Sequence, residues 1–130
     1  MMGWNPAREP YINLATYRKT GAEVRTPVWI AENAGTLYVF SESKAGKVKR
    51  IRANGRARIA ACDVRGNLKS DWLDASARIV TDSGEIAGMY AAFARKYGWQ
   101  MRILNLLARL SGRYNRRAII AISLSPAVNG

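Results

Sequence analysis

The sequence contains no histidine, one cysteine and only nine acidic residues. Histidine is the commonest general base and the commonest metal ligand in proteins, so its absence excludes a Ser-His-Asp triad and zinc-dependent hydrolysis. The one cysteine, Cys62, allows no disulfide within the chain and fits a reducing compartment. Because Cys62 lies in an apolar stretch, we expect a small buried residue and not a reactive thiol.

Long hydrophobic runs are also missing. No apolar stretch reaches the roughly 18 residues that are needed to span a bilayer. The first residues, with Asn5, Pro6 and Glu9, lack the apolar core of a signal peptide. We therefore expect a cytoplasmic protein without membrane insertion.

The charges that are present are mostly positive. The chain has 21 Lys and Arg residues and a formal net charge of +12 at pH 7. Nucleic acid, an anionic membrane surface or a multiply charged small molecule would each be attracted by this field. Net charge alone does not choose among these partners.

Hydrophobic periodicity predicts strands early in the chain and helices late. Six strands are predicted, at 11–17, 23–31, 36–40, 56–64, 72–80 and 117–124. A short helix is predicted at 46–53 with Gly55 as its stop, and a pair of helices is predicted at about 82–97 and 100–110.

These elements predict one mainly β domain over residues 1–130. The first three strands are expected to form a meander, with Pro27 at an edge or bulge because proline cannot donate a hydrogen bond to the ladder. Short chains hide strand edges by closing the sheet. We therefore expect a β-barrel with accessory helices at about 11–124, in the form of a six-stranded antiparallel split barrel.

The densest run of cations extends from Ser41 to Arg52, where a strand gives way to the short helix. The first N–H groups of a helix lack partners within the helix, and Ser hydroxyls and Lys ammonium groups beside them complete an anion site. The segment therefore indicates a phosphate-bearing ligand. A solvated basic surface is the alternative interpretation of this run alone.

Several short motifs occur in a characteristic order along the chain. They are Thr-Pro-Val-Trp at 26–29, Leu-Tyr-Val-Phe-Ser at 37–41, the basic run at 44–52, Arg-Ala-Arg-Ile at 56–59, Cys-Asp-Val-Arg-Gly at 62–66 and Phe-Ala-Arg-Lys-Tyr-Gly-Trp at 93–99. This set resembles the pyridoxamine-phosphate-oxidase-like split-barrel proteins that bind a flavin or deazaflavin, in particular the small actinobacterial oxidoreductases dependent on coenzyme F-420. The resemblance covers about 11–124. One departure is Asn54-Gly55-Arg56, where the family usually has Asp-Pro-Arg.

The resemblance implies a homodimer in which the cofactor lies in a groove between two barrels. It implies that Ser43, Lys44 and Lys47 hold the cofactor phosphate, that Arg50 extends this positive surface, and that Ser41 also binds the cofactor. It also implies that the strand with Thr26, Pro27, Val28 and Trp29 runs along the cofactor ring, although a tryptophan such as Trp29 is more often a core residue than a stacking platform.

The excess of cations, with Lys49, Arg52, Arg56 and Arg58 near the phosphate segment, favours the deazaflavin F-420 over FMN, because F-420 carries more negative charge.

The function implied is an oxidoreductase that transfers a hydride to an unidentified small organic substrate. No catalytic residue and no metal ligand are assigned. A cofactor-binding protein without catalysis is one alternative. A basic nucleic-acid-binding barrel is another, and it is disfavoured because the aromatic residues lie within apolar runs. The late helical segment is expected to be mostly core, and its remaining apolar residues either rim a substrate pocket or lie on an anionic surface.

Overall fold

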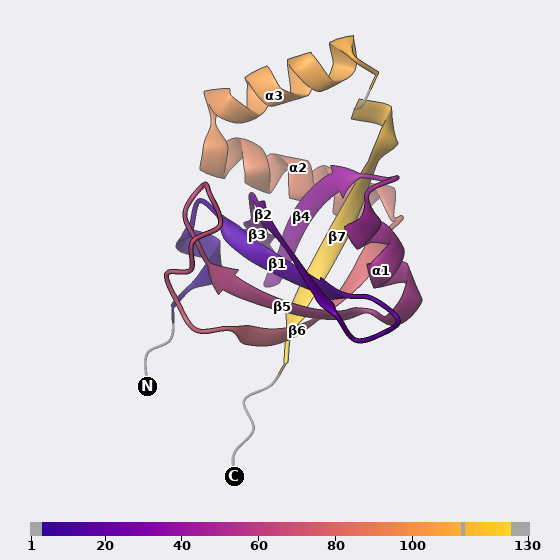
Figure 1. Ribbon diagram of the computed structural model, residues 1–130. Helices are drawn as coiled ribbons and strands as arrows, with labels where there is room; N and C mark the ends of the chain where they lie inside the picture. Colours follow the sequence, from indigo (N-terminus) through magenta and orange to yellow (C-terminus); the bar gives the residue numbers. More distant parts are fainter. Residues whose placement is uncertain (1–3, 113, 126–130) are drawn as a thin grey trace.

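Seven antiparallel strands form one curled sheet in the computed structural model of the chain, which describes residues 4–112 and 114–125 (Figure 1). The strands are β1 (Ile12–Tyr17), β2 (Glu23–Val28), β3 (Ala31–Asn33), β4 (Thr36–Glu42), β5 (Arg56–Ala61), β6 (Leu73–Val80) and β7 (Arg117–Leu124). The helices are α1 (Gly46–Asn54), α2 (Ser83–Tyr97) and α3 (Trp99–Leu110), with short 3-10 turns at Pro6–Arg8 and Tyr114–Arg116. The order across the sheet is β2-β1-β5-β6-β7-β4-β3.

The two edge strands of this sheet, β2 and β3, follow each other in the chain with only Trp29 and Ile30 between them. Three residue steps span at most about 11 Å, so the two edges of the sheet are held close together. This connection curls the sheet into a split barrel. The predicted fold class, a mainly β antiparallel split barrel with accessory helices, is confirmed.

The strand predicted at 23–31 is confirmed for 23–28, where it forms the expected hairpin with β1, but it does not continue to 31. The sheet therefore has seven strands where six were expected. The chain leaves the ladder after Val28, because the backbone N–H of Ile30 donates to Tyr97 Oη (3.0 Å) and not to a neighbouring strand. β3 then pairs with β4, which itself pairs with β7, so the expected three-strand meander is also wrong.

Two further details of the strand prediction have clear outcomes. The expected strand at 56–64 ends at Ala61, after which Cys62 makes only an isolated bridge with Leu68. Pro27 lies on an edge strand, as predicted, because β2 pairs only with β1.

Two hydrophobic clusters organise the molecule. The first fills the barrel and includes alternate residues of β7, Ala118, Ile120 and Ile122, together with Val48 and Ile51 of α1. The second lies between the outer side of β4 and β7 and the helices, and Phe93 and Met101 are buried in it. In Figure 1, α2 packs beside the sheet and α3 forms the outermost layer beyond it.

Among the described residues, the model contains no helix with the length and apolar composition of a bilayer span.

Candidate functional site

The first part of the site is the junction where β4 ends and α1 begins. Ala45 is the N-cap of α1 and has no side chain that can accept a hydrogen bond from the first turn. No described residue accepts a hydrogen bond from the N–H groups of Gly46 and Lys47, because these groups lie in the first turn, and the Ala45 carbonyl accepts only from Val48 and Lys49. The start of α1 therefore keeps free donors and the positive end of the helix dipole.

Two half-buried cations, Lys47 and Arg50, lie at this helix start. Arg50 Nε donates to Thr16 Oγ1 at 2.7 Å, and its guanidinium lies so close to Gly46 that a Cβ there would be 2.7 Å from Nη1. Within the described residues, no carboxylate forms an ion pair with Lys47 or Arg50. The fold therefore brings positive charges together without a counter-charge, which favours the binding of an anion.

The pKa values of both groups reflect this lack of compensation. Burial and the neighbouring Arg50 lower the pKa of Lys47. Burial and the neighbouring Arg18 lower the pKa of Arg50. A bound phosphate would raise both pKa values, because it supplies the missing negative charge.

The remaining predicted phosphate residues lie on the segment that leads into α1. Ser41 and Ser43 are half-buried, and Lys44 is exposed. The backbone N–H of Ser43 donates to the Arg116 carbonyl at 2.6 Å, which fixes the path of the chain before the helix. Ser41, Ser43 and Lys44 thus lie on the segment immediately before α1, the helix that carries Lys47 and Arg50.

The second part of the site is an apolar groove beneath α3. A hollow of about 410 Å³ is lined by Pro27, Val28, Trp29, Phe40 and Leu104, among others. A second hollow of about 350 Å³ is lined by Phe40, Ser41, Glu42, Leu104, Leu107 and Arg117, among others. Because both hollows share Phe40 and Leu104, we treat them as one feature, the α3 groove. Its volumes lie within the range typical of small-molecule sites.

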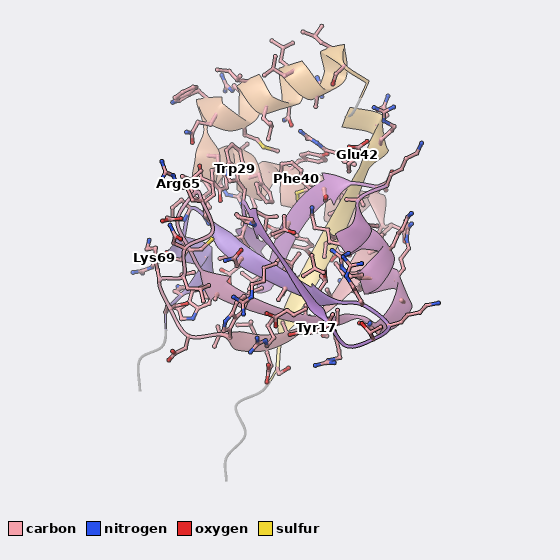
Figure 2. All side chains as sticks on the ribbon, viewed as in Figure 1. Tyr17, Trp29, Phe40, Glu42, Arg65 and Lys69 are labelled. Atoms are coloured by element: carbon pink, nitrogen blue, oxygen red, sulfur yellow. The ribbon has the colours of Figure 1, made fainter. Side chains whose placement is uncertain are left out.

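The α3 groove leads from the end of β2 toward the start of α1. Trp29, Phe40 and Glu42 are labelled in this order from the β2 side to the α1 side in Figure 2. Ser41 joins the two parts of the site, because it lines the groove and stands two residues before Ser43 in the phosphate segment. An elongated ligand with a flat apolar part and an anionic end matches this arrangement.

The four residues predicted to flank a ring are not all in the groove. Pro27, Val28 and Trp29 line it. Thr26 is paired with Leu14 in the register of β1 and β2, so it shares the barrel-facing side with that core residue. Trp29 is half-buried and stacks on Tyr97 with ring centroids 4.2 Å apart, so it serves both the core and the groove wall.

Sequence reasoning missed Phe40 and Arg117 as groove residues. The Arg117 guanidinium lies 4.4 Å from the centre of the Phe40 ring, and Nη1 donates to Asn105 Oδ1 at 2.7 Å. Arg117 reaches the groove because it is paired with Glu42 across β4 and β7. This pairing joins residues 75 positions apart, so no local sequence pattern predicts that Arg117 lies beside Phe40.

The sequence led to expectations about one thiol and about metal ligands. Cys62 is fully buried, as expected, and burial raises the pKa of its thiol. Among the described residues, no group of His, Cys, Asp and Glu side chains is arranged to hold a metal ion.

Comparison with known proteins supports the fold. The sequence matches no protein-family model, and a search of curated proteins gave no match. The structure is similar to that of the heme storage protein HutZ of Vibrio cholerae, with a TM-score of 0.70, 14% identity, and coverage of 94% of this chain and 86% of that one.

Two flavin-related structures are also similar. A provisional pyridoxamine 5′-phosphate oxidase of Listeria innocua has a TM-score of 0.62 and 11% identity, with coverage of 93% of this chain and 88% of that one. A FAD-binding protein of Mesorhizobium loti has a TM-score of 0.62 and 16% identity, with coverage of 92% and 82%. The chain therefore has the split-barrel fold found in pyridoxamine-phosphate-oxidase-like and flavin-binding proteins, as the sequence motifs indicated.

Proposed function

We propose that the chain is an oxidoreductase that binds a deazaflavin, coenzyme F-420, in the α3 groove, with FMN as the alternative cofactor. The observation that carries this proposal is an apolar groove whose lining includes Ser41 and Glu42 at the end of β4, a few residues before the start of α1. That helix start has free N–H donors and two half-buried cations without a described carboxylate partner. A ring with a phosphate-bearing side chain requires both features, one beside the other.

Each part of such a cofactor has residues that fit it. Lys44, Lys47 and Arg50 would hold the phosphate together with the Ser41 and Ser43 hydroxyls, since ammonium and guanidinium groups form charge-assisted hydrogen bonds to phosphate oxygens. Pro27, Val28 and Trp29 would flank the ring, and Thr26 would position this strand from the barrel side.

The chemistry would need little from the side chains. A flavin or deazaflavin supplies hydride transfer to or from a substrate held against its ring. Phe40, Trp29 and Leu104 form apolar walls of the groove that would orient a flat molecule. Arg117 places a positive charge at the groove wall, where it would stabilise negative charge that develops on a bound ring.

The choice between the two cofactors depends on free cations near the phosphate. Of the four expected there, Arg58 is paired with Glu23 at 2.6 Å, and the Arg56 guanidinium lies 4.2 Å from the centre of the Tyr17 ring. Lys49 and Arg52 are exposed on α1 and have no ion pair with a described residue. Lys49 and Arg52 are therefore the two cations that favour F-420 over FMN, because F-420 is longer and more acidic.

Heme is a possible ligand to weigh, because one structural neighbour is a heme storage protein. Heme iron is usually held by histidine, cysteine, methionine or tyrosine. This chain has no histidine, and its one cysteine is fully buried. Of these ligand types, the described lining of the α3 groove contains only Tyr11. A flavin-type ring needs no axial ligand, so it suits this lining better than heme does.

Binding of the cofactor without catalysis is a second candidate function. Among the groove residues that the structure gives, the ionisable ones are Tyr11, Glu42 and Arg117, and we assign none of them as a general base. Reduction of a substrate by the protein with its cofactor bound would show that it is an oxidoreductase and not only a cofactor-binding protein.

The homodimer implied by the resemblance is part of the proposal. The groove is open along one side, where Val64 is 63% exposed at its rim. A second copy that covers this side would exclude water from a bound ring, as hydride transfer requires.

The proposal is tested by titrating F-420 and FMN separately with the protein and following quenching of cofactor fluorescence. We expect binding of both, with F-420 the tighter ligand. Submicromolar binding of FMN with no binding of F-420 would reverse the choice of cofactor. Absence of binding by either compound would contradict the proposal.

A further inference from the structure

α3 presents a second apolar surface, on the side that faces away from the groove. Its members recur at helical spacing and are between 49% and 77% exposed. They are Trp99, Ile103, Leu106 and Leu110, which we call the α3 outer face. Apolar residues of this size that line one side of an outermost helix mark an interaction surface.

The opposite side of α3 anchors the helix to the protein. Met101 is 1% exposed and belongs to the cluster under α2, and Leu104 packs against the same cluster. The helix is therefore held in place by its inner side. It can present the outer face to a partner without unfolding, and Figure 1 shows α3 as the outermost layer.

The charged residues of α3 are all positive, because the helix carries Arg102 and Arg109 and no Asp or Glu. Residues 86–130 contain no Asp or Glu, but they contain seven of the 21 cations of the chain. These are Arg95, Lys96, Arg102, Arg109, Arg113, Arg116 and Arg117. Arg102 and Arg109 are exposed and, one heptad apart, follow one flank of the apolar face.

This charge pattern discriminates between two possible occupants. In a symmetric contact between two copies, the same surface meets itself, so Arg102 and Arg109 would face other cations with no acidic residue in the helix to offset them. An anionic bilayer surface is complementary to the same pattern, because its headgroups attract the arginines while its acyl boundary accepts the apolar side chains.

We propose that the α3 outer face binds the surface of an anionic lipid bilayer, with Trp99, Ile103, Leu106 and Leu110 in the headgroup boundary and Arg102 and Arg109 at the headgroups. The protein is then a peripheral membrane protein. This inference does not depend on the cofactor proposal, because none of these six residues lines the α3 groove.

The test is sedimentation of the full chain with vesicles of equal parts phosphatidylcholine and phosphatidylglycerol, compared with vesicles of phosphatidylcholine alone. We expect binding to the anionic vesicles that weakens as salt is added. The double variant Leu106→Gln/Leu110→Gln should weaken binding about tenfold or more, because it removes two apolar side chains from the boundary. The matched control Leu68→Gln/Leu124→Gln changes two exposed leucines outside α3 and should bind like the wild type.

A second pair of variants tests the role of the arginines. It also keeps the proposal testable if the leucine variant misfolds. Arg102→Gln should weaken binding roughly fivefold. The control Arg65→Gln changes an exposed arginine between β5 and β6 and should weaken binding by less than about twofold. Failure of the wild type to bind anionic vesicles would overturn the proposal, as would wild-type binding by Arg102→Gln. A wild-type oligomer that Leu106→Gln/Leu110→Gln dissociates would also overturn it, since a second copy would then occupy the face.

Discussion

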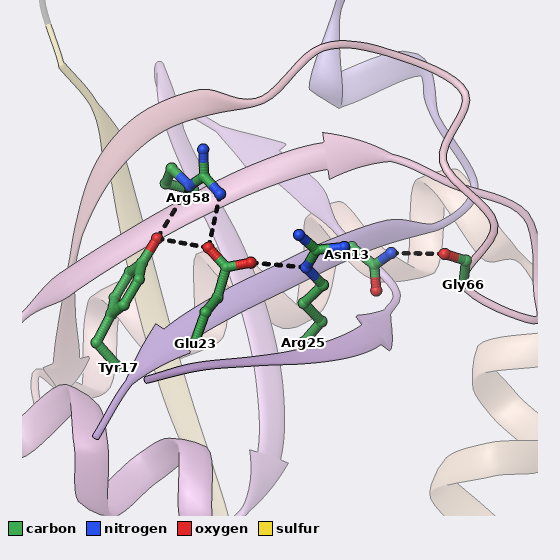
Figure 3. Close-up of polar contacts among 6 residues, drawn as sticks. All are labelled: Asn13, Tyr17, Glu23, Arg25, Arg58 and Gly66. Atoms are coloured by element: carbon green, nitrogen blue, oxygen red, sulfur yellow. Dashed lines mark hydrogen bonds and ion pairs between the residues drawn. The ribbon is translucent and has the colours of Figure 1, made fainter. Parts of the chain in front are cut away.

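Glu23 is the centre of a polar cluster on the outer side of β1, β2 and β5 (Figure 3). It accepts hydrogen bonds from Tyr17 at 2.9 Å, Arg25 at 2.6 Å and Arg58 at 2.6 Å. The guanidinium groups of Arg25 and Arg58 both lie over the ring of Trp72, 4.8 and 4.7 Å from its centre. This layer contributes to the burial of both sides of β1, an arrangement unusual for a strand near a sheet edge.

The cluster makes stability depend on pH. Burial raises the pKa of Glu23, but hydrogen bonds from Arg25, Arg58 and Tyr17 outweigh it and hold the pKa at about 2, below the usual 4.5. The carboxylate therefore stabilises the fold above pH 4.5, and this contribution is lost as the pH falls from 4.5 to 2.

Replacing Glu23 tests this link. Glu23→Gln should lower the free energy of unfolding at pH 7 by about 1–2 kcal/mol, a value reduced by solvent screening of the half-exposed Arg25. Urea denaturation at pH 7, 4 and 3 should show that the difference in unfolding free energy between wild type and variant becomes smaller as the pH falls. Glu32→Gln, at an exposed position without an ion pair to a described residue, is the control. A difference that stays constant over this range would contradict the assignment.

Among the helices and strands, those with local signals were predictable. Asp82 caps α2 by accepting from the Glu85 N–H at 2.8 Å, and Gly55 ends α1 with a φ of 68°. Both were visible as an acidic cap before a periodic run and a glycine after one. The break in the strand predicted at 23–31 was not visible, because it depends on the Tyr97 hydroxyl reaching Ile30 across 67 residues.

The Asn54-Gly55-Arg56 turn shows why a departure from the family pattern is tolerated. Gly55 adopts a left-handed conformation, its N–H donates to the Ile51 carbonyl, and its own carbonyl accepts from the Ala77 N–H at 2.8 Å. Asn54 Oδ1 accepts from the Arg56 N–H at 2.8 Å. The turn thus stops α1 and ties it to β6 without a proline.

Gly55→Ala should therefore destabilise the fold by more than about 2 kcal/mol. An alanine is strained in the left-handed conformation of this position, and its Cβ would lie 3.2 Å from the Ala77 carbonyl oxygen. The matched control is Gly21→Ala, where φ is 90° but no atom lies within 4 Å, so only the strain of about 1–2 kcal/mol applies. Chemical denaturation of both variants measures the difference. Equal losses would show that the Gly55–Ala77 contact is unimportant.

For the molecule as a whole, the sequence located one half of the candidate site and not the other. The phosphate segment is contiguous, so its cations and its helix start could be read directly from residues 41–52. The groove could not, because its walls come from β2, β4, α3 and β7, which the fold brings together from distant parts of the chain. Motif order supplied the ring-flanking strand, but only the structure shows Thr26 turned toward the barrel.

The most direct test of the central proposal removes the two lysines of the phosphate segment. Lys44→Ala/Lys47→Ala should weaken binding of both F-420 and FMN at least tenfold, because each lysine would make a charge-assisted contact with the phosphate. Lys19→Ala/Lys69→Ala makes the same change in net charge outside the site and should leave binding within about threefold of wild type. The measurement is fluorescence titration of both cofactors with all three proteins. Wild-type affinity of Lys44→Ala/Lys47→Ala for both cofactors would contradict the account.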